Sequence, residues 1–514
     1  MSNIATNTII IMIATMLSKG LGFFRELCLG SAYGASAYTD AYIISLNIPV
    51  VIFSSIALAL GTSYIPLFCD VKERLGEEQS IRFSNNIINI VVIACTIISI
   101  ICIIFAKPIV SIFAMGFEGE TLDLTIKFTR ILMIGIIFIG VNDVIMPFLQ
   151  VKGNFFIPGV LGVPYNIVII LSIFASLKYG IEILVYGTLF AIISKVLFQI
   201  PFAKKLGYKY EPYINLKDEY LKKLITLVSP VFIGVAVNQI NGLVDKTLAS
   251  TLVEGSISAL NYANKLNEFV LGLFITSICA VIYPMLSKFS SENNNEEFID
   301  AIKKSINGVI ILIIPVSIGA MVLSKPIVKL LFERNAFDAH ATKMTAEALF
   351  FYAIGILGFG LRDVLSRVFY SIQDTKTPMI NGAMAMGINI VLNLILVKSF
   401  KHSGLALATS ISSLVCIVLL FKSLHKKIGY FGQDRIRTVL LKSLVSGVVM
   451  GVGSIVSYSF ISPLLGVGFI GQAISLIITV LISAVIYFIM IFLLKVQEVT
   501  DFILALKSKV KRRV

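Results

Sequence analysis

The feature that most constrains this chain is a series of apolar stretches, each 18 residues or longer, that recurs along its whole length. A stretch of that length can span the hydrocarbon core of a bilayer as a helix. Inside lipid, every backbone N–H and C=O group must be hydrogen-bonded within the protein, and a helix does this within one segment. A membrane β-barrel would instead show short segments of alternating polarity. The sequence therefore predicts an all-α integral membrane protein.

Composition and charge agree with that class. Of the 514 residues, 57% are hydrophobic and only 14% are charged, which is too few charges to cover the surface of a soluble protein. Lys and Arg exceed Asp and Glu by 43 − 29 = 14. The excess lies in short loops and in the C-terminal tail, as is typical of the cytoplasmic side of a membrane protein. Nucleic acid is not expected as a partner, because it would require a basic face on a soluble surface.

The apolar stretches predict about fourteen transmembrane helices. Their approximate positions are 4–28, 40–66, 85–105, 126–150, 155–177, 181–203, 221–251, 262–285, 303–323, 345–371, 378–398, 403–424, 439–460 and 466–495. The positive-inside rule then places both termini in the cytoplasm, with loops 29–39 and 252–261 outside. The loop 324–344 is basic although it falls on the outer side, and there we expect an amphipathic surface helix.

An internal repeat divides the chain. The letters KPIV occur at Lys107–Val110 and again at Lys325–Val328, and the same shift of 218 residues carries Pro66 onto Pro284. Because six spans bring the chain back to the same side, two six-helix repeats run in parallel, related by a pseudo-symmetry axis along the membrane normal. Such bundles suit alternating access. The predicted divisions are an N-terminal six-helix bundle at 1–215, a C-terminal six-helix bundle at 216–430, and two additional helices with a basic tail at 431–514.

Charged residues in the first span indicate what the protein moves. Ionisable side chains at membrane depth are costly, and they usually face a cavity or a partner. Lys19 and Arg25 lie in this span together with Glu26, and Gly20 and Gly22 would let the helix bend so that both cations reach one cavity. Alternatively, Arg25 and Glu26 only extend to the outer interface. Lys19 is too deep for that, which favours a cationic cavity for an anionic substrate.

Two further positions belong to the predicted substrate site. Lys265 and Glu268 are spaced i,i+3 in the eighth span, where they either pair with each other or line a cavity with the neighbouring asparagines. Asp40 opens the second span, where its carboxylate can cap the helix N-terminus.

A separate group of oxygen-bearing residues lies in the seventh, eleventh and twelfth spans. Carboxylate, amide and hydroxyl oxygens are ligands for hard cations, and a sodium ion is one interpretation. Hydrogen bonding between helices is the alternative. The group consists of Asp245, Asn389, Asn393 and Thr409.

Several segments in combination resemble the MurJ (MviN) lipid II flippase family, which shares a superfamily with the MATE exporters. The segments are Ser18–Glu26, Thr39–Pro49, Tyr64–Phe68, Leu260–Phe269 and Phe369–Pro378. The resemblance extends over essentially the whole chain. It implies two bundles around a central cationic cavity, and a groove for a polyprenyl tail at the last two helices.

The resemblance also suggests the residues of the cavity. The family's cavity arginines correspond to Lys19, Arg25 and Lys265, so that two of the three are lysine in this chain. The change keeps the charge but loses the planar fork that binds phosphate in a bidentate manner. The predicted substrate-binding residues are Lys19, Arg25, Glu26, Asp40 and Lys265, and family members that hold sodium have it near the oxygen-bearing group.

The implied function is transport across the bacterial inner membrane rather than an enzymatic reaction. The substrate would be an undecaprenyl-diphosphate-linked peptidoglycan precursor, lipid II, moved from the inner to the outer leaflet. Membrane potential or an ion gradient would drive transport, since the chain has no Walker A segment. Membrane lipids and cell-wall synthases are the expected partners.

Four alternatives remain open at this stage. Two are from the same superfamily: a flippase for another polyprenyl-linked oligosaccharide, and a MATE-type antiporter, although the cations of the first span argue against an exporter of cations. A third is a membrane-embedded glycan polymerase, which usually carries its catalytic acid on a larger outer loop than any predicted here. The fourth is a scaffold without transport activity, which would tolerate every substitution in the cavity.

Overall fold

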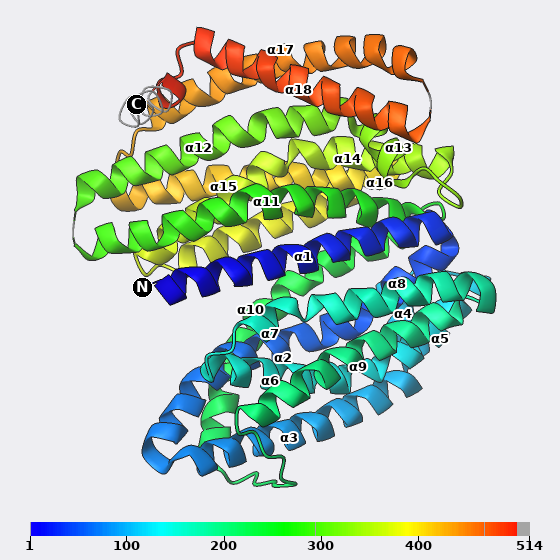
Figure 1. Ribbon diagram of the computed structural model, residues 1–514, viewed down its shortest axis with the longest axis vertical. Coiled ribbons are helices and arrows are strands. Elements are labelled where there is room, and N and C mark those ends of the chain that lie inside the picture. The colour runs from blue at the N-terminus through cyan, green and yellow to red at the C-terminus, as the bar shows by residue number, and fades with distance from the viewer. Residues whose placement is uncertain (1, 293, 467, 501–514) are drawn as a thin grey trace. The chain divides into compact units, whose positions relative to one another are not determined.

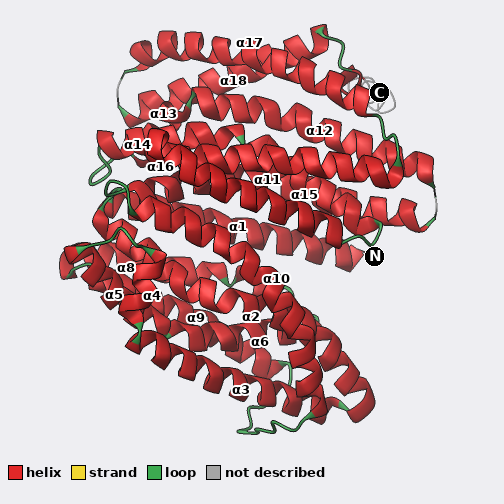
Figure 2. Ribbon diagram, turned by 180° about the vertical axis from the view of Figure 1, so that it is seen from behind, coloured by secondary structure: helices red, strands yellow, loops and turns green. Residues whose placement is uncertain are grey.

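The computed structural model describes residues 2–292, 294–466 and 468–500, and all regular secondary structure in these residues is helical (Figure 2). The helices, labelled in Figure 1, are α1 (Ser2–Tyr33), α2 (Ala37–Leu75), α3 (Glu77–Ile104), α4 (Ala106–Phe113), α5 (Gly119–Met133), α6 (Gly135–Val151), α7 (Phe156–Val160), α8 (Gly162–Tyr179), α9 (Glu182–Lys205), α10 (Glu219–Ser250), α11 (Ser256–Ser291), α12 (Asn295–Val322), α13 (Ser324–Phe332), α14 (Ala339–Ile354), α15 (Ile356–Ser371), α16 (Lys376–Ile428), α17 (Gln433–Leu465) and α18 (Phe469–Leu493).

The prediction of an all-α, multi-pass membrane protein is confirmed. Within the described residues, nine helices are long and apolar enough to cross a membrane, and the bent pair α14–α15 can supply a tenth span. Helix α16 contains two of the predicted spans, 378–398 and 403–424. Lys401, with φ 51° and ψ −133°, interrupts the helical backbone between them. The 53 residues of α16 are therefore two spanning arms joined at a kink.

The chain divides into two compact units. The first unit contains Met1–Ser258 and Arg334–Phe337, and the second contains Ala259–Glu333 and Asp338–Val514. Helix α10 packs against α2 within the first unit. These compact units follow packing rather than sequence repetition, so the repeat-based divisions at 215/216 and 430/431 stay predictions.

The two copies of the KPIV sequence occupy equivalent places. Each lies in a short helix that directly follows a long span: α4 follows α3, and α13 follows α12. Ser324, Val328 and Phe332 form the buried face of α13, while Lys325 is exposed. The amphipathic helix predicted for the loop 324–344 is therefore present. The next span is divided at a single residue in both cases, at Ile134 between α5 and α6 and at Gly355 between α14 and α15. The second pair is bent by 42°.

Small residues bring neighbouring helices close together in both units. In the first unit, a Cβ atom at Gly187 of α9 would overlap the Ser172 side chain of α8. In the second unit, Gly447 and Gly451 lie four residues apart on α17 and face Ile318 of α12. A Cβ atom at Gly447 would lie 2.5 Å from Ile318 Cδ1. This is the small-xxx-small contact by which membrane helices pack in the absence of a hydrophobic driving force. Figure 1 shows α17 and α18 side by side beyond α12.

A polar tie joins the two arms of α16. The Asp374 carboxylate, in the loop before this helix, accepts hydrogen bonds from Lys427 Nζ at 2.5 Å and from Thr377 Oγ1 at 2.6 Å. Asn381 Nδ2 donates to Ser423 Oγ at 3.0 Å one turn further along. Burial opposes ionisation of Asp374, but the hydrogen bonds from Lys427 and Thr377 outweigh it and lower its pKa to about 2. The carboxylate therefore stays charged and keeps the arms together.

We predict that Asp374→Asn lowers the melting temperature of the purified protein at pH 7. The folded pKa lies below the ordinary value of 3.8, so the stabilisation is complete above about pH 4 and is lost as the pH falls toward 2. The difference in melting temperature between wild type and variant should therefore shrink between pH 4 and pH 2. A difference that stays constant over this range would contradict the assignment of the tie to the ionised carboxylate.

Candidate functional site

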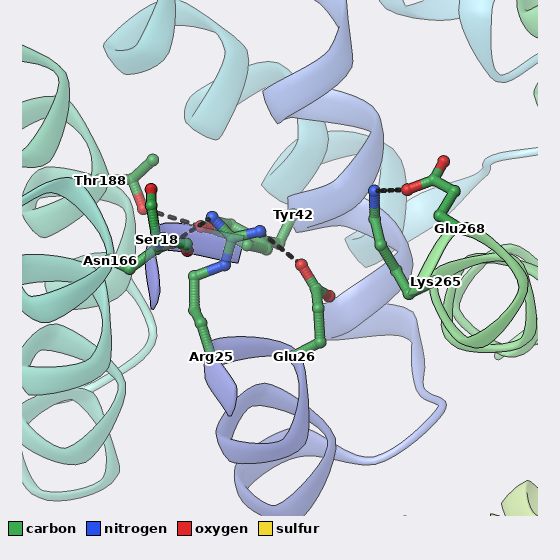
Figure 3. A network of polar contacts seen from close by, with 8 residues as sticks. All are labelled: Ser18, Arg25, Glu26, Tyr42, Asn166, Thr188, Lys265 and Glu268. Atoms are coloured by element: carbon green, nitrogen blue, oxygen red, sulfur yellow. Dashed lines mark hydrogen bonds and ion pairs between the residues drawn. The ribbon is translucent and has the colours of Figure 1, made fainter. Parts of the chain in front are cut away.

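The Arg25 side chain is held inside the first unit by three partners. Its Nη2 atom donates to Glu26 Oε1 at 2.5 Å, and its Nη1 atom donates to Asn166 Oδ1 at 3.1 Å (Figure 3). The guanidinium carbon lies 5.7 Å from the centre of the Tyr165 ring. Glu26 is only 5% exposed. Arg25 and Glu26 therefore form a buried ion pair against α8 and do not extend to the outer interface.

Close packing of α1 on α8 creates this arrangement. Asn166 Nδ2 donates to the carbonyl oxygen of Ser18 at 3.3 Å, so that one amide contacts both turns of α1. A Cβ atom at Gly162 would overlap the Ser18 side chain, and one at Gly22 would lie 3.5 Å from Asn166 Nδ2. Helix α1 is continuous from Ser2 to Tyr33. Gly22 thus serves for close approach, and a break in the helix at Gly20 and Gly22 is not what orients Arg25.

Lys19 is the available cation of α1. Its side chain is exposed, and within the described residues it makes no hydrogen bond or ion pair. An ammonium group with three unused donors can bind an oxyanion such as a phosphate. Lys19 and Arg25 therefore differ: the ammonium group of Lys19 is available to a ligand, whereas the guanidinium of Arg25 is held by Glu26 and Asn166.

Lys265 and Glu268 pair on the surface of α11, as one of the two interpretations predicted. Lys265 Nζ lies 2.8 Å from Glu268 Oε2 (Figure 3). Asn264 Nδ2 also donates to Glu268 Oε1 at 2.9 Å. The Lys265 side chain is 34% exposed and that of Glu268 is 53% exposed. An ion pair this exposed holds its partners weakly, so Lys265 can exchange Glu268 for a more highly charged anion.

Asp40 has a role that its sequence position did not predict. It lies in the first turn of α2, whose N-cap is Ser36. Its carboxylate accepts hydrogen bonds from the backbone N–H groups of Gly255 at 2.8 Å and Ser258 at 2.7 Å, and also from the Ser258 hydroxyl. Asp40 thus caps the N-terminus of α11 rather than that of its own helix. Asp40 is 3% exposed, which makes it a positioning residue rather than a contact for substrate.

Three of the four oxygen-bearing residues meet on the arms of α16. Asn393 Nδ2 donates to Asn389 Oδ1 at 3.0 Å, and Asn389 Nδ2 lies 3.4 Å from Thr409 Oγ1. The Thr409 hydroxyl itself donates to the Leu405 carbonyl oxygen at 2.9 Å. These contacts agree with the second of the two interpretations, hydrogen bonding between helices. Asp245 lies on α10 in the first unit.

Two charged residues of the first unit were missed in the sequence. Asp143 on α6 and Lys195 on α9 lie within helices that can span the membrane. The rule that singled out Lys19, that a charge at membrane depth requires a partner or a cavity, applies equally to both.

The family model described as lipid II flippase MurJ matches residues 29–472. A probable lipid II flippase from Buchnera aphidicola subsp. Schizaphis graminum is 30% identical over 503 residues, covering 96% of this chain and 98% of that protein. A probable lipid II flippase from Vibrio cholerae is 30% identical over 458 residues, covering 86% and 87%.

Solved structures give the same result for the fold. A structure of the lipid II flippase MurJ, in an inward closed conformation, superposes with a TM-score of 0.81 at 27% identity, covering 96% of this chain and all of that one. An inward-facing multidrug transporter of the MATE family superposes with a TM-score of 0.65 at 17% identity, covering 83% and 99%. At that identity the likeness concerns the fold alone. From the match over residues 29–472, the chain belongs to the lipid II flippase MurJ family.

Proposed function

We propose that this protein is a lipid II flippase of the bacterial inner membrane, a multi-pass transporter and not an enzyme. The observation that carries this proposal is the match to the flippase family over residues 29–472. Lipid II carries a diphosphate between an undecaprenyl tail and a headgroup of sugars and peptide. Moving that headgroup across the bilayer requires fixed positive charge along its path, because an unpaired anion in hydrocarbon costs several kcal/mol.

Two exposed cations fit this requirement, one in each compact unit. Lys19 is exposed and unpaired within the described residues, and Lys265 has only an exposed partner. We assign these two lysines to the diphosphate and the peptide carboxylates. Arg25 supplies a fixed charge on the same helix, since Glu26 and Asn166 hold its guanidinium in place.

The proposal extends to coupling and partners. Transport proceeds by alternating access and draws on the membrane potential or an ion gradient. The cell-wall synthases that polymerise lipid II at the outer leaflet are the proposed protein partners. An antiporter of cationic drugs would require acidic rather than basic exposed groups at these positions.

The function is tested by depleting the protein and measuring the leaflet on which lipid II accumulates. In depleted cells lipid II should accumulate on the inner leaflet, and expression of Lys19→Ala should not restore flipping. Lys19→Arg should restore it, because it keeps the charge and adds the bidentate fork. Lys107→Ala, which removes an exposed cation of α4, serves as the control and should restore flipping fully. Accumulation on the outer leaflet after depletion would contradict the proposal.

Arg25→Ala should fail for a different reason. Removing the guanidinium breaks the buried ion pair with Glu26, which costs about 3–5 kcal/mol. The level of folded protein should therefore fall, and Arg25→Lys should recover part of it. Lys19→Ala should leave the protein level unchanged. If Arg25→Ala accumulates normally in the membrane, the ion pair with Glu26 is not the main contribution of Arg25.

We propose that both termini face the cytoplasm, as the distribution of basic loops indicates. In a cysteine-free background, Tyr38→Cys, in the first turn of α2, should react with an impermeant thiol reagent in intact cells. Glu292→Cys, between α11 and α12, should react only in broken cells. Both positions are exposed, so accessibility within the protein is matched. The reverse labelling pattern would invert the orientation.

We also propose that sodium binds at the amide and hydroxyl oxygens of Asn389, Asn393 and Thr409, with Asp245 as a predicted further ligand. The chemistry of these oxygens supports the proposal. Sodium should raise the melting temperature of the purified protein in a saturable manner, and Asn389→Ala should abolish the rise. Asp245→Asn in the same titration tests its contribution. Equal responses to sodium and to potassium in wild type and Asn389→Ala would remove the site.

A further inference from the structure

The first unit contains a cavity whose lining residues are not among those assigned to the substrate above. Its volume is about 280 Å³, close to the lower end of the range for small-molecule sites, roughly 300 Å³. Apolar side chains of α2, α5, α6 and α9 form most of its wall. The polar groups that line it are Asn47, Asn142, Asp143, Tyr165 and Lys195.

Two opposite charges line this cavity without contacting each other. The Asp143 carboxylate accepts a hydrogen bond from Asn142 Nδ2 at 2.8 Å. Lys195 Nζ lies 4.2 Å from the centre of the Tyr165 ring, and within the described residues it makes no hydrogen bond or ion pair. Gln199 Nε2 donates to Asn142 Oδ1 at 2.8 Å, which keeps the Asn142 amide turned toward Asp143. The ammonium donors and most carboxylate lone pairs therefore remain available to a ligand.

Charge balance restricts the kind of ligand. Arg25 and Glu26 neutralise each other beside Tyr165, and Asp143 and Lys195 together also carry no net charge. A bound anion or cation would add an uncompensated charge at membrane depth, which is expensive. A molecule with an ammonium group and an oxyanion would satisfy both side chains and leave the site neutral.

The internal repeat shows that the separation of the two charges is particular to the first unit. Gly140-x-x-Asp143-Val and Gly360-x-x-Asp363-Val share one motif at a shift of 220 residues. Both glycines are in tight contact, Gly140 with Val91 and Gly360 with Ile275. Asp363, however, has a cation directly beside it, because the neighbouring residue is Arg362, whose Nη2 lies 3.9 Å from its carboxylate.

In the first unit that neighbouring position is Asn142, and the positive charge is instead Lys195 on another helix, across the cavity. In the second unit the motif thus places the acid, Asp363, next to the cation Arg362. In the first unit the acid, Asp143, and the cation Lys195 line a cavity without contacting each other. Asp363 is consequently a matched control for Asp143.

We propose that the cavity between α2, α6, α8 and α9 binds a dipolar group, with Asp143 receiving its ammonium and Lys195 its oxyanion. Two molecules carry this chemistry: the peptide of lipid II, where an amino group and a carboxylate occur together, and a zwitterionic lipid headgroup such as phosphoethanolamine. The first source rests on the proposed function, whereas the second does not.

The test compares binding of lipid II with binding of the same lipid II acetylated at its peptide amine, using purified full-length protein in phosphatidylglycerol nanodiscs. Wild type should bind the unmodified form about tenfold more tightly. Asp143→Asn/Lys195→Gln should bind both forms equally and remain folded, because the double change keeps the site neutral. Asp363→Asn should retain the wild-type preference. Undecaprenyl diphosphate, which lacks the peptide, should bind wild type and the double variant alike.

A second comparison distinguishes the sources. If a lipid headgroup is the ligand, phosphatidylethanolamine nanodiscs should raise the melting temperature of wild type and Asp363→Asn but not of the double variant. A preference for unmodified lipid II or this shift supports the dipolar site. If the double variant matches wild type in both comparisons, the cavity holds water only and the proposal is wrong. If wild type binds neither form of lipid II nor undecaprenyl diphosphate, the proposed function fails, and the headgroup comparison still decides the cavity.

Discussion

The cost of placing a charge at membrane depth governs the interior of this protein. An unpartnered ion there is penalised by several kcal/mol, a large fraction of the stability of an ordinary domain. The chain meets this constraint within single units, as when Arg25 is bonded to Glu26 and to Asn166. The hydrogen bond from Arg25 to Asn166 requires α1 and α8 to approach closely, and glycines such as Gly22 and Gly162 make that approach possible. Close helix packing is therefore part of how these charges are stabilised.

This constraint separates fixed charges from available ones. Arg25 is hydrogen-bonded to Glu26 and Asn166 inside the first unit, so it polarises its surroundings from a fixed position. Lys19, two turns earlier on α1, is exposed, and Lys265 on α11 shares its charge only with an exposed glutamate. A transporter needs the second kind of charge, because a substrate must be released as readily as it is bound. A buried ion pair such as Arg25–Glu26 has no net charge with which to bind the diphosphate.

Much of the fold could be predicted from apolar length alone, and the short helix α13 from the basic loop 324–344. The partners of the charged residues could not. Asp40 was expected to cap α2, but it caps α11, because the loop after α10 brings Gly255 and Ser258 onto its carboxylate. Local spacing identifies pairs such as Lys265 and Glu268, which are three residues apart. It carries no information on contacts between helices that lie 141 residues apart, as Arg25 and Asn166 do.

The two copies of the repeat share their helix packing but differ in the charges around the equivalent residues Asp143 and Asp363. Gly140 and Gly360 keep the same close helix contact, so the backbone around Asp143 and Asp363 is constrained alike. Exchange of arginine for asparagine beside the acid leaves the packing intact but moves the nearest compensating charge to a different helix. A contact within one helix persists whenever that helix is intact, whereas a contact across a cavity also depends on what fills the cavity. The first unit therefore combines a cavity lined by opposite charges with the close helix contact at Gly140.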